Sequence, residues 1–472
     1  MNNQKQAHEP PPSRDAIQAM FNARCVAVVG ASNDPKKYGC MTLRTLVESG
    51  FTGRIYPVNP KGGVFQGLEA VAALGEIPGK IDLVVVLVPA RFVPGVLEEA
   101  GALGVKAAIV TSSGFSEMGH PEAEAEILRI ARAHGMRLLG PNVLGATYLP
   151  NRLCAHFFPD LHNSGPVAMI SQSGSLTNGL TEWLEHDGIG ACSTVNLGNQ
   201  ADLVESDFLE YFAEDPNVAA VCMYLEGVKD GRRFLDALAY CTARKPVAIL
   251  KAGRSAAGSR SAASHTGSMA GAHRVFEAAC RQHGAQVAYG LGELYDQARA
   301  LATLPVLTGD RILVISTSGG IGTLAVDEAE VQGLTVPELP AAMVEELKGR
   351  GLARLGNIGN PIDLAAIWAE ELRDCALIAD KYDVCDVMLL NFGDPVEQTT
   401  ENVLEAVGQV RAGLAVTYLG GGREEQKARP ALQQAGVAVF ESPERAVRAI
   451  RAAVDYGRYR AQLARRGKEG AR

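Results

Sequence analysis

The feature that most constrains the fold of this chain is an apolar run that ends in a Ser/Gly turn and occurs twice. The first copy is VAMISQSGS at 167–175, and the second is ILVISTSGG at 312–320. Each copy is followed by Gly-Asn-x-x-Asp-Leu, at 198–203 and at 359–364, and later by an apolar run that leads to Gly-Arg. Chance similarity between α/β units is the alternative, and the conserved order of the markers makes it the weaker one. A duplicated structural unit is therefore predicted.

The part of the chain before the duplication alternates short apolar runs with amphipathic stretches. Runs such as CVAVV at 25–29 and LVVVLV at 83–88 are apolar throughout, as in strands buried on both faces of a parallel sheet. The segments between them are long enough for crossover helices. These features predict an α/β chain of doubly wound domains. The predicted boundaries are 1–13 for a disordered lead-in, and 14–153, 154–305 and 306–462 for three domains.

Composition excludes several classes of protein. The 472 residues correspond to about three domains of ~150 residues. The net charge of -8 argues against nucleic acid as a main partner, because duplex binding needs a basic face. No apolar run reaches the ~18 residues needed to cross a membrane, and the polar N-terminus lacks a signal-peptide core, so a cytoplasmic location is predicted. The nine scattered cysteines form no CxxC pair, which predicts buried free thiols and no metal site.

The first predicted domain carries a candidate phosphate-binding turn. VVGASNDPKKYG at 28–39 follows a strand-like run and opens a helix, where backbone N–H groups and the helix dipole can hold a phosphate. The turn is not GxGxxG, and the second strand ends in VNPK at 58–61 without an acidic residue, which disfavours an NAD dehydrogenase. A plain βα turn is the alternative, and the nearby lysines favour a ligand. Because ligands of open α/β sheets bind at the carboxyl ends of the strands, the residues expected to line this site are Gly30, Ser32, Lys36, Lys37, Asn59, Lys61, Val88, Pro89, Ser112, Ser113 and Asn142.

Both duplicated turns are candidate anion sites. Small residues at a helix start let an anion approach the backbone donors closely. Serine is also a common N-cap, so the signal gains its strength from its recurrence. Two equivalent helix starts suggest that one phosphate is held between them, by Ser173, Gly174, Ser318, Gly319 and Gly320.

A stretch rich in Gly, Ser and Ala, at 253–268, contains His265. Such small side chains cannot anchor a core, so a mobile loop is predicted. A lone histidine is usually structural, but this one has little core to join, and a neutral imidazole there could attack a phosphoryl group. Glu226, which follows a strand-like run, is the candidate to orient the imidazole, and a solvated strand-end charge is the alternative. The third domain lacks histidine, and its position matching Glu226 falls near Asn391 or Phe392, so the chemistry is predicted in the first copy only.

Together these motifs resemble the α subunits of NDP-forming acyl-CoA synthetases, such as ADP-forming acetate–CoA ligase, and more distantly succinyl-CoA synthetase. The resemblance spans residues from about 14 to 455 and keeps the family's order. The matching motifs are VVGAS (28–32), PVNPK (57–61), TSSGFSE (111–117), GPN (140–142), SQSGSL (171–176), YLEGVKD (224–230), SHTGS (264–268) and STSGGIG (316–322).

This resemblance implies a Rossmann-like CoA-binding domain followed by two flavodoxin-like domains. It implies that His265 is phosphorylated, that Glu226 orients it, and that the two helix starts bind phosphate. The implied reaction converts acyl-CoA, phosphate and NDP reversibly into the carboxylic acid, CoA and NTP. Phosphate attacks the thioester to give an acyl phosphate, His265 takes the phosphoryl group, and the loop carries it to a nucleotide site.

The family's ATP-grasp module has no counterpart in the three predicted domains. The resemblance therefore implies a separate β subunit that binds ADP or ATP with Mg²⁺, commonly in an α2β2 assembly. One alternative is a non-catalytic, CoA-binding regulatory protein of the same fold, which the presence of both His265 and Glu226 disfavours. A protein acyltransferase is another, although no added acetyltransferase domain is visible. The sequence does not identify the carboxylic acid, and it does not distinguish ADP from GDP.

Overall fold

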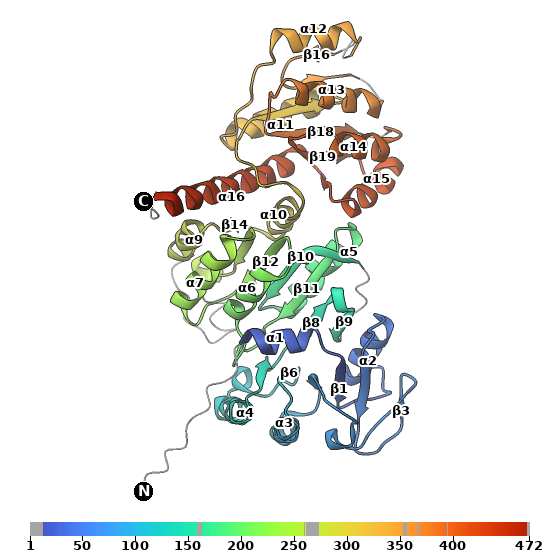
Figure 1. Ribbon diagram of the computed structural model, residues 1–472, viewed down its shortest axis with the longest axis vertical. Coiled ribbons are helices and arrows are strands. Elements are labelled where there is room, and N and C mark those ends of the chain that lie inside the picture. The colour runs from blue at the N-terminus through green and yellow to red at the C-terminus, as the bar shows by residue number, and fades with distance from the viewer. Residues whose placement is uncertain are drawn as a thin grey trace. The chain divides into compact units, whose positions relative to one another are not determined.

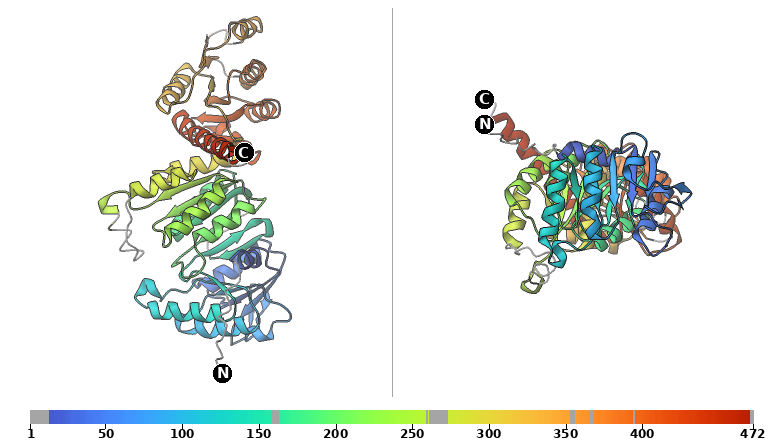
Figure 2. Two further views of the ribbon diagram at one scale, coloured as in Figure 1. Left: turned by 60° about the vertical axis from the view of Figure 1, so that its left-hand side comes forward. Right: turned by 90° about the horizontal axis from the view of Figure 1, so that it is seen from below.

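A computed structural model of the chain describes residues 13–157, 163–258, 260, 273–352, 356–365, 368–393 and 395–469 (Figure 1). The chain divides into two compact units. The first unit comprises Met1–Trp183, Gly190–Arg244 and Leu250–Ala279, and the second comprises Leu184–Ile189, Lys245–Ile249 and Cys280–Arg472. Three large sheets and a two-stranded hairpin form the β structure of the described residues. Turned views show the helices packed against these sheets (Figure 2).

The first sheet is parallel and has the order β2-β1-β5-β6-β7. Its strands are β1 (Cys25–Val29), β2 (Arg54–Val58), β5 (Leu83–Val86), β6 (Ala107–Val110) and β7 (Arg137–Leu139). The accompanying helices are α1 (Ser13–Phe21), α2 (Tyr38–Glu48), α3 (Val93–Ala102) and α4 (Pro121–Ala133), and the hairpin is β3 (Val64–Phe65) with β4 (Leu68–Glu69). Every residue of the inner strands β1, β5 and β6 is buried, as the apolar runs predicted. The strand order reverses direction beside β1, which makes this a doubly wound, Rossmann-like sheet.

The second sheet has the order β14-β13-β12-β10-β11-β8-β9. Its strands are β8 (Gly145–Tyr148), β9 (Leu153–His156), β10 (Ser164–Ser171), β11 (Ala191–Asn196), β12 (Ala220–Leu225), β13 (Val247–Lys251) and β14 (Gln286–Ala288). The accompanying helices are α5 (Gly174–His186), α6 (Glu205–Glu214), α7 (Gly231–Thr242), α9 (His273–Gln282) and α10 (Leu291–Thr303). The hairpin of β8 and β9 pairs with β11, so residues 145–153 join the second sheet although the sequence analysis placed them in the first domain. The reason is that an apolar run predicts a strand but not its partner.

The third sheet has the order β16-β17-β15-β18-β19-β20. Its strands are β15 (Ile312–Ser316), β16 (Asn357–Ile358), β17 (Ile362–Asp363), β18 (Val387–Gly393), β19 (Gly413–Leu419) and β20 (Ala438–Phe440). The accompanying helices are α11 (Gly319–Val331), α12 (Ala341–Gly349), α13 (Ala369–Lys381), α14 (Thr399–Val407), α15 (Arg423–Gln434) and α16 (Pro443–Glu469). Helix α16 packs on α10 and α11 and continues to Glu469, beyond the predicted domain end at 462.

The second and third sheets share one architecture, which confirms the predicted α/β duplication. The order β8-β11-β10-β12-β13-β14 matches β16-β17-β15-β18-β19-β20, and in both an antiparallel strand stands at the same edge. The turns match in detail. The Ser171 hydroxyl donates to the carbonyl of Ser173 at 2.9 Å, and the Ser316 hydroxyl donates to that of Ser318 at 2.7 Å.

The strand register corrects one predicted equivalence. Asn196 lies opposite Ser171, and Asp363 lies opposite Ser316, so Asp363 corresponds to Asn196. The sequence analysis had aligned Asp363 with Asp202 through their shared Gly-Asn-x-x-Asp-Leu context. In the second copy this context contains the strand residue Asp363, whereas in the first copy it begins at Gly198, after the strand residue Asn196. Its recurrence therefore does not reflect structural equivalence.

The register also moves the counterpart of Glu226. Tyr224 lies opposite Ser171 and Asn391 lies opposite Ser316, so Tyr224 and Asn391 are equivalent. Two residues further on, Glu226 corresponds to Gly393, and the predicted counterparts Asn391 and Phe392 are wrong. The conclusion drawn from them holds, because glycine also lacks a carboxylate.

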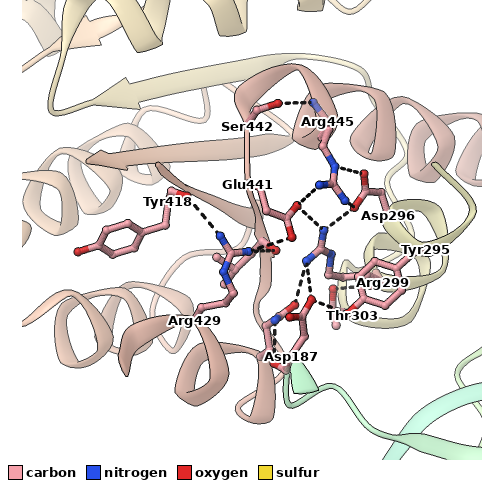
Figure 3. A network of polar contacts seen from close by, with 12 residues as sticks. Asp187, Tyr295, Asp296, Arg299, Thr303, Tyr418, Arg429, Glu441, Ser442 and Arg445 are labelled. Atoms are coloured by element: carbon pink, nitrogen blue, oxygen red, sulfur yellow. Dashed lines mark hydrogen bonds and ion pairs between the residues drawn. The ribbon is translucent and has the colours of Figure 1, made fainter. Parts of the chain in front are cut away.

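Buried ion pairs organise the second unit around Arg299, whose side chain is 0% exposed (Figure 3). Arg299 of α10 pairs with Asp296, and its guanidinium lies 3.7 Å from Asp187. Asp296 also pairs with Arg445 of α16 at 2.7 Å, and Arg445 pairs with Glu441 at 2.6 Å. Removing one charged side chain from this network would leave its partner with an uncompensated charge. The ion pairs therefore hold α10, α16 and the end of β20 together.

The cysteine thiols are buried in the protein core, and the described residues include neither a membrane-spanning helix nor a metal-binding group. All nine cysteines are free thiols and all are buried, as the sequence analysis expected. In the described part of the chain, no helix is long and apolar enough to cross a membrane. Among the same residues, no group of three His, Cys, Asp or Glu side chains could hold a metal ion.

Candidate active site

The turns predicted to bind a ligand in the first domain lie along one edge of its sheet, because parallel strands present their carboxyl ends together. Hydrogen bonds join neighbouring turns. The Asn59 amide donates to the carbonyl of Ala31 at 2.9 Å, and the Ser112 hydroxyl donates to that of Val88 at 2.5 Å. The N–H of Asn142 donates to the carbonyl of Ser112 at 3.0 Å. The structure thus brings together residues from all five predicted turns.

Two glycines make the first of these turns tight. Gly30 has φ +98°, and a Cβ added there would lie 2.7 Å from the carbonyl oxygen of Leu87. Helix α2 approaches the same turn, because a Cβ on Gly39 would lie 2.1 Å from the carbonyl oxygen of Gly30. This close approach aims the first turn of α2 at the carboxyl edge of the sheet, where its N–H groups can meet a phosphate.

Charged side chains surround this turn. The N–H of Asp34 donates to the Ser32 hydroxyl at 3.1 Å, and the Asp34 carboxylate accepts the N–H of Lys36 at 3.0 Å. Lys36, Lys37 and Lys61 are exposed. No described carboxylate forms an ion pair with any of these three lysines. Their charges are therefore available to an anionic ligand such as the phosphates of CoA. The glycine cradle and this basic rim fit that molecule.

A shared polar cluster joins the first and second domains within the first unit. The Glu117 carboxylate accepts the N–H groups of Gly114 and Phe115 at 2.6 and 3.2 Å and the Asn199 amide at 2.5 Å. Burial by itself would raise the pKa of Glu117, but the hydrogen bonds from Asn199, Gly114 and Phe115 outweigh it and lower the pKa. Lys229 donates to the carbonyls of Asn199 and of the next residue at 2.9 Å each. The sequence analysis quoted these residues only as motif letters and did not predict the cluster.

Glu226 follows β12 and is 7% exposed. Its backbone is held by a side chain that the sequence analysis missed. The Gln172 amide oxygen accepts the N–H of Glu226 at 2.5 Å and that of Gly227 at 3.0 Å. The Gln172 amide nitrogen donates to the carbonyl of Gly227 at 2.7 Å. Burial, together with the charge of Glu226 and a hydrogen bond to it, raises the pKa of Tyr224 to about 12. Glu226 is therefore a positioned carboxylate at a strand end.

The turn that precedes α5 follows β10, which pairs in parallel with β12, so it lies at the strand end next to the one that Glu226 follows. The Ser171 hydroxyl accepts the N–H of Ser173 at 3.2 Å, and the Thr177 hydroxyl donates to the Ser173 carbonyl at 2.7 Å. A Cβ on Gly174 would lie 2.9 Å from Leu144. The hydrogen bonds of Gln172 link this turn to Glu226, so the structure brings two of the predicted site elements of the first unit together.

The equivalent turn in the second unit is built in the same way. The N–H of Ser318 donates to the Ser316 hydroxyl at 3.2 Å, and the Ser318 side chain makes no cap hydrogen bond. A Cβ on Gly319 would lie 2.6 Å from the Asp363 carboxylate, while Gly320 is exposed. Because this turn and Ser173 belong to different units, the prediction that they hold one phosphate stays a prediction.

His265 lies outside the described residues, so its role as the phosphorylated side chain also stays a prediction. Before it, β13 ends at Lys251 and the described residues continue through 252–258 and 260; after it, they resume with α9 at His273. Ser113, Val88 and Pro89 stand at their predicted strand ends.

Comparison with known proteins covers most of the chain. Residues 24–149 match a family described as a CoA binding domain, and residues 164–301 match one described as a succinyl-CoA ligase like flavodoxin domain. The chain is 39% identical over 464 residues to the α subunit of ADP-forming acetate–CoA ligase I of Pyrococcus furiosus, covering 95% of this chain and 99% of that one. ADP-forming acetate–CoA ligase I of Archaeoglobus fulgidus is 35% identical over 437 residues, which are 92% of this chain but 63% of that protein.

A solved structure agrees with these relatives. The dinucleotide forming acetyl-coenzyme A synthetase 1 of Candidatus Korarchaeum cryptofilum, in complex with phosphate and ADP, superposes with a TM-score of 0.89 at 35% identity. The match covers 95% of this chain and 98% of that chain.

Proposed function

The chain belongs to the family of α subunits of ADP-forming acetate–CoA ligases, and from this premise we propose that it carries the CoA- and phosphate-handling half of reversible ADP-forming acid–CoA ligation. The observation that supports this most strongly is the buried Glu226, held by the Gln172 amide beside the turn that opens α5. That arrangement supplies a fixed carboxylate and a helix start near each other, which phosphoryl transfer through a histidine requires.

The first domain binds CoA in this proposal. The turn at Gly30, closed by Gly39, admits phosphate oxygens to the first N–H groups of α2. Lys36, Lys37 and Lys61 neutralise the phosphate charges from the exposed rim. The turns at Val88, Pro89, Ser112, Ser113 and Asn142 extend the site along the sheet edge toward the polar cluster of Glu117 and Asn199. The thioester would then lie toward the second domain, where the phosphate is expected.

The chemistry proceeds in two transfers on this chain. An oxygen of inorganic phosphate attacks the thioester carbon, the C–S bond breaks, and CoA leaves as the thiol with a proton from the phosphate. A nitrogen of His265 then attacks phosphorus, the bond between phosphorus and the acyl oxygen breaks, and the carboxylic acid leaves as its anion. Glu226 accepts the hydrogen bond of the other ring N–H and stabilises the charge that forms on the imidazole. The N–H groups at Ser173-Gly174 hold the phosphoryl oxygens, and the equivalent N–H groups at Ser318, Gly319 and Gly320 are proposed to bind phosphate as well.

A second subunit completes the reaction. We propose that an ATP-grasp β subunit, in an α2β2 assembly, takes the phosphoryl group from His265 onto ADP with Mg²⁺. The names of the Pyrococcus relatives, which are subunits, support a partner, as does the longer Archaeoglobus relative, of which this chain matches 63%. The buried free thiols support a reducing, cytoplasmic location. The substrate is a small carboxylic acid or its CoA ester.

Reconstitution tests this proposal. The purified chain is mixed with its candidate ATP-grasp subunit, ADP, phosphate and a panel of acyl-CoAs, and ATP formation is followed. We expect ATP to form with at least one acyl-CoA. His265→Ala should abolish that turnover while the affinity for CoA survives. Equal loss of CoA binding would contradict the assignment of His265. Tight CoA binding without turnover on any acyl-CoA would make the chain a CoA-binding regulator.

A further inference from the structure

Lys251 is a buried ammonium group without a counter-charge. It ends β13, is 6% exposed, and its Nζ lies 5.6 Å from the ring centre of Phe276, which stacks on Phe234. Its hydrogen bond is to the carbonyl of the next residue at 3.0 Å. Among the residues that the structure describes, no carboxylate pairs with it. Burial lowers the pKa of Lys251. An unpaired charge in such a place is costly, so a reason for keeping it must come from function.

His273 is the first residue of α9, the ten-residue helix whose Phe276 lies under the Lys251 ammonium group. Its side chain is 8% exposed, and neither ring nitrogen has a hydrogen-bond partner. The nearest carboxylate oxygen, on Glu277, is 3.9 Å from Nε2, beyond hydrogen-bond range. Burial lowers the pKa of His273, and the charges of Lys251 and Arg254 lower it further, against an opposite effect of Glu277. These neighbouring buried groups thus leave donors unused and repel one another.

The segment that joins Lys251 to α9 has no acidic residue before Glu277. From Lys251 to Phe276 there is no Asp or Glu, while Arg254, Arg260 and Arg274 add positive charge. This happens in a chain whose net charge is -8. A bound anion would supply the counter-charge that Lys251 lacks among the described residues.

The duplicated copy shows that the charge is not needed by the fold. The N–H of Ala252 donates to the carbonyl of Leu225 at 2.8 Å, which pairs Lys251 with Leu225. In the third sheet the corresponding pair is Tyr418 with Phe392. Tyr418 is 0% exposed, and its hydroxyl donates to a backbone carbonyl at 3.0 Å. The same position is thus filled by a neutral, hydrogen-bonded side chain in the copy.

We propose that Lys251 and His273, with the first N–H groups of α9, form a binding site for a phosphate-type oxyanion. The ammonium group supplies charge, the imidazole supplies an N–H donor, and a helix start favours an anion. This site differs from the turn at Ser173. Side chains alternate along a strand, so Lys251 and Leu225 point to one face of the sheet and Tyr224, which contacts Glu226, points to the other. The anion is inorganic phosphate or the phosphate group of ADP or CoA.

Phosphate binding to the full chain tests the site. Equilibrium dialysis with radiolabelled inorganic phosphate is carried out on the wild type, Lys251→Met and His273→Gln. Lys348→Met is the matched control, because Lys348 is exposed on α12 and pairs with Glu345. We expect each site variant to bind one equivalent fewer than the wild type, or to bind it at least tenfold more weakly, and the control to match the wild type. Identical binding in the wild type and both site variants would overturn the proposal.

Two further measurements keep the test independent of folding and of the proposed function. Without phosphate, Lys251→Met should unfold at the same or a higher temperature, because it removes a buried unpaired charge. The phosphate-induced rise in unfolding temperature should shrink in that variant. His265→Ala should keep the equivalent that depends on Lys251, so failure of the phosphohistidine mechanism leaves this site standing. Displacement of phosphate by ADP, or by CoA but not by CoA without its 3′-phosphate, would identify the source of the anion.

Discussion

Replacing Gln172 by alanine tests how Glu226 is positioned. The change removes three hydrogen bonds, to the N–H groups of Glu226 and Gly227 and to the carbonyl of Gly227, with lengths of 2.5, 3.0 and 2.7 Å. Each such bond contributes about 1 kcal/mol net, so the free energy of unfolding should fall by about 3 kcal/mol. A domain stable by about 5–15 kcal/mol stays folded after this loss. Glu226 would then be free to move, and a displacement of about 1 Å reduces turnover by about 10²-fold.

The assay combines chemical unfolding of the full chain with turnover in the reconstituted enzyme. Gln409→Ala is the matched control, because its amide bonds to Glu405 on an exposed helix surface at 3.4 Å. It should change the free energy of unfolding by less than about 0.5 kcal/mol. CoA affinity should be the same in Gln172→Ala, Gln409→Ala and the wild type. A Gln172→Ala enzyme with wild-type turnover would refute the reasoning that this amide positions the catalytic carboxylate.

Four further outcomes are expected. Gly39→Ala must displace α2, since its Cβ would lie 2.1 Å from a backbone oxygen, so the Kd for CoA measured by calorimetry should rise at least tenfold; an unchanged Kd would detach α2 from the CoA site. Lys36→Ala and Lys37→Ala should each weaken CoA by about 1 kcal/mol, and unchanged affinity in both would move the CoA phosphates elsewhere. Asp202→Ala removes the 2.8 Å ion pair between Asp202 and the buried Arg137, and thermal unfolding should report a loss of about 3–5 kcal/mol, which a loss below about 1 kcal/mol would contradict. Because the pKa of Glu117 is lowered in the folded state, its contribution to stability is present above the unfolded pKa and is lost as the pH falls through the folded pKa, so Glu117→Gln should flatten the acid limb of the unfolding profile; an unchanged limb would contradict it.

Much of the fold follows from the sequence because buried parallel strands are apolar at nearly every position. The runs at β1, β5 and β6 illustrate this. Because these strands are parallel, the turns that follow them must lie at the same edge of the sheet. The hairpin β8–β9 could not be assigned, because pairing with β11 depends on tertiary contacts that periodicity does not encode. The Gly-Asn-x-x-Asp-Leu motif gave a wrong alignment of Asp202 with Asp363 for a related reason. The motif stands at different positions relative to the strand in the two copies, and the register aligns Asp363 with Asn196.

The sequence allowed predictions about the candidate site where the chemistry depends on residue type. Glu226 was predicted because a histidine that takes a phosphoryl group needs a carboxylate to orient it and this residue follows a strand, and the glycine turns were predicted because anions need small neighbours. The positioning residues were not found. Gln172 acts through its side-chain amide on the backbone of Glu226, which follows β12, the second strand along the chain from β10. Lys251 differs from a surface lysine only by its burial. Neither property can be read from a single sequence.

The measurement that tests the central claim most directly is phosphorylation of the purified chain. It is incubated with radiolabelled phosphate and a panel of acyl-CoAs, and separately with its β subunit and labelled ATP. The account predicts an acid-labile, base-stable label that mass spectrometry places on His265, and that is absent in His265→Ala. The same label is strongly reduced in Glu226→Gln. A label on another residue, or no label under either condition while CoA still binds, would contradict the account.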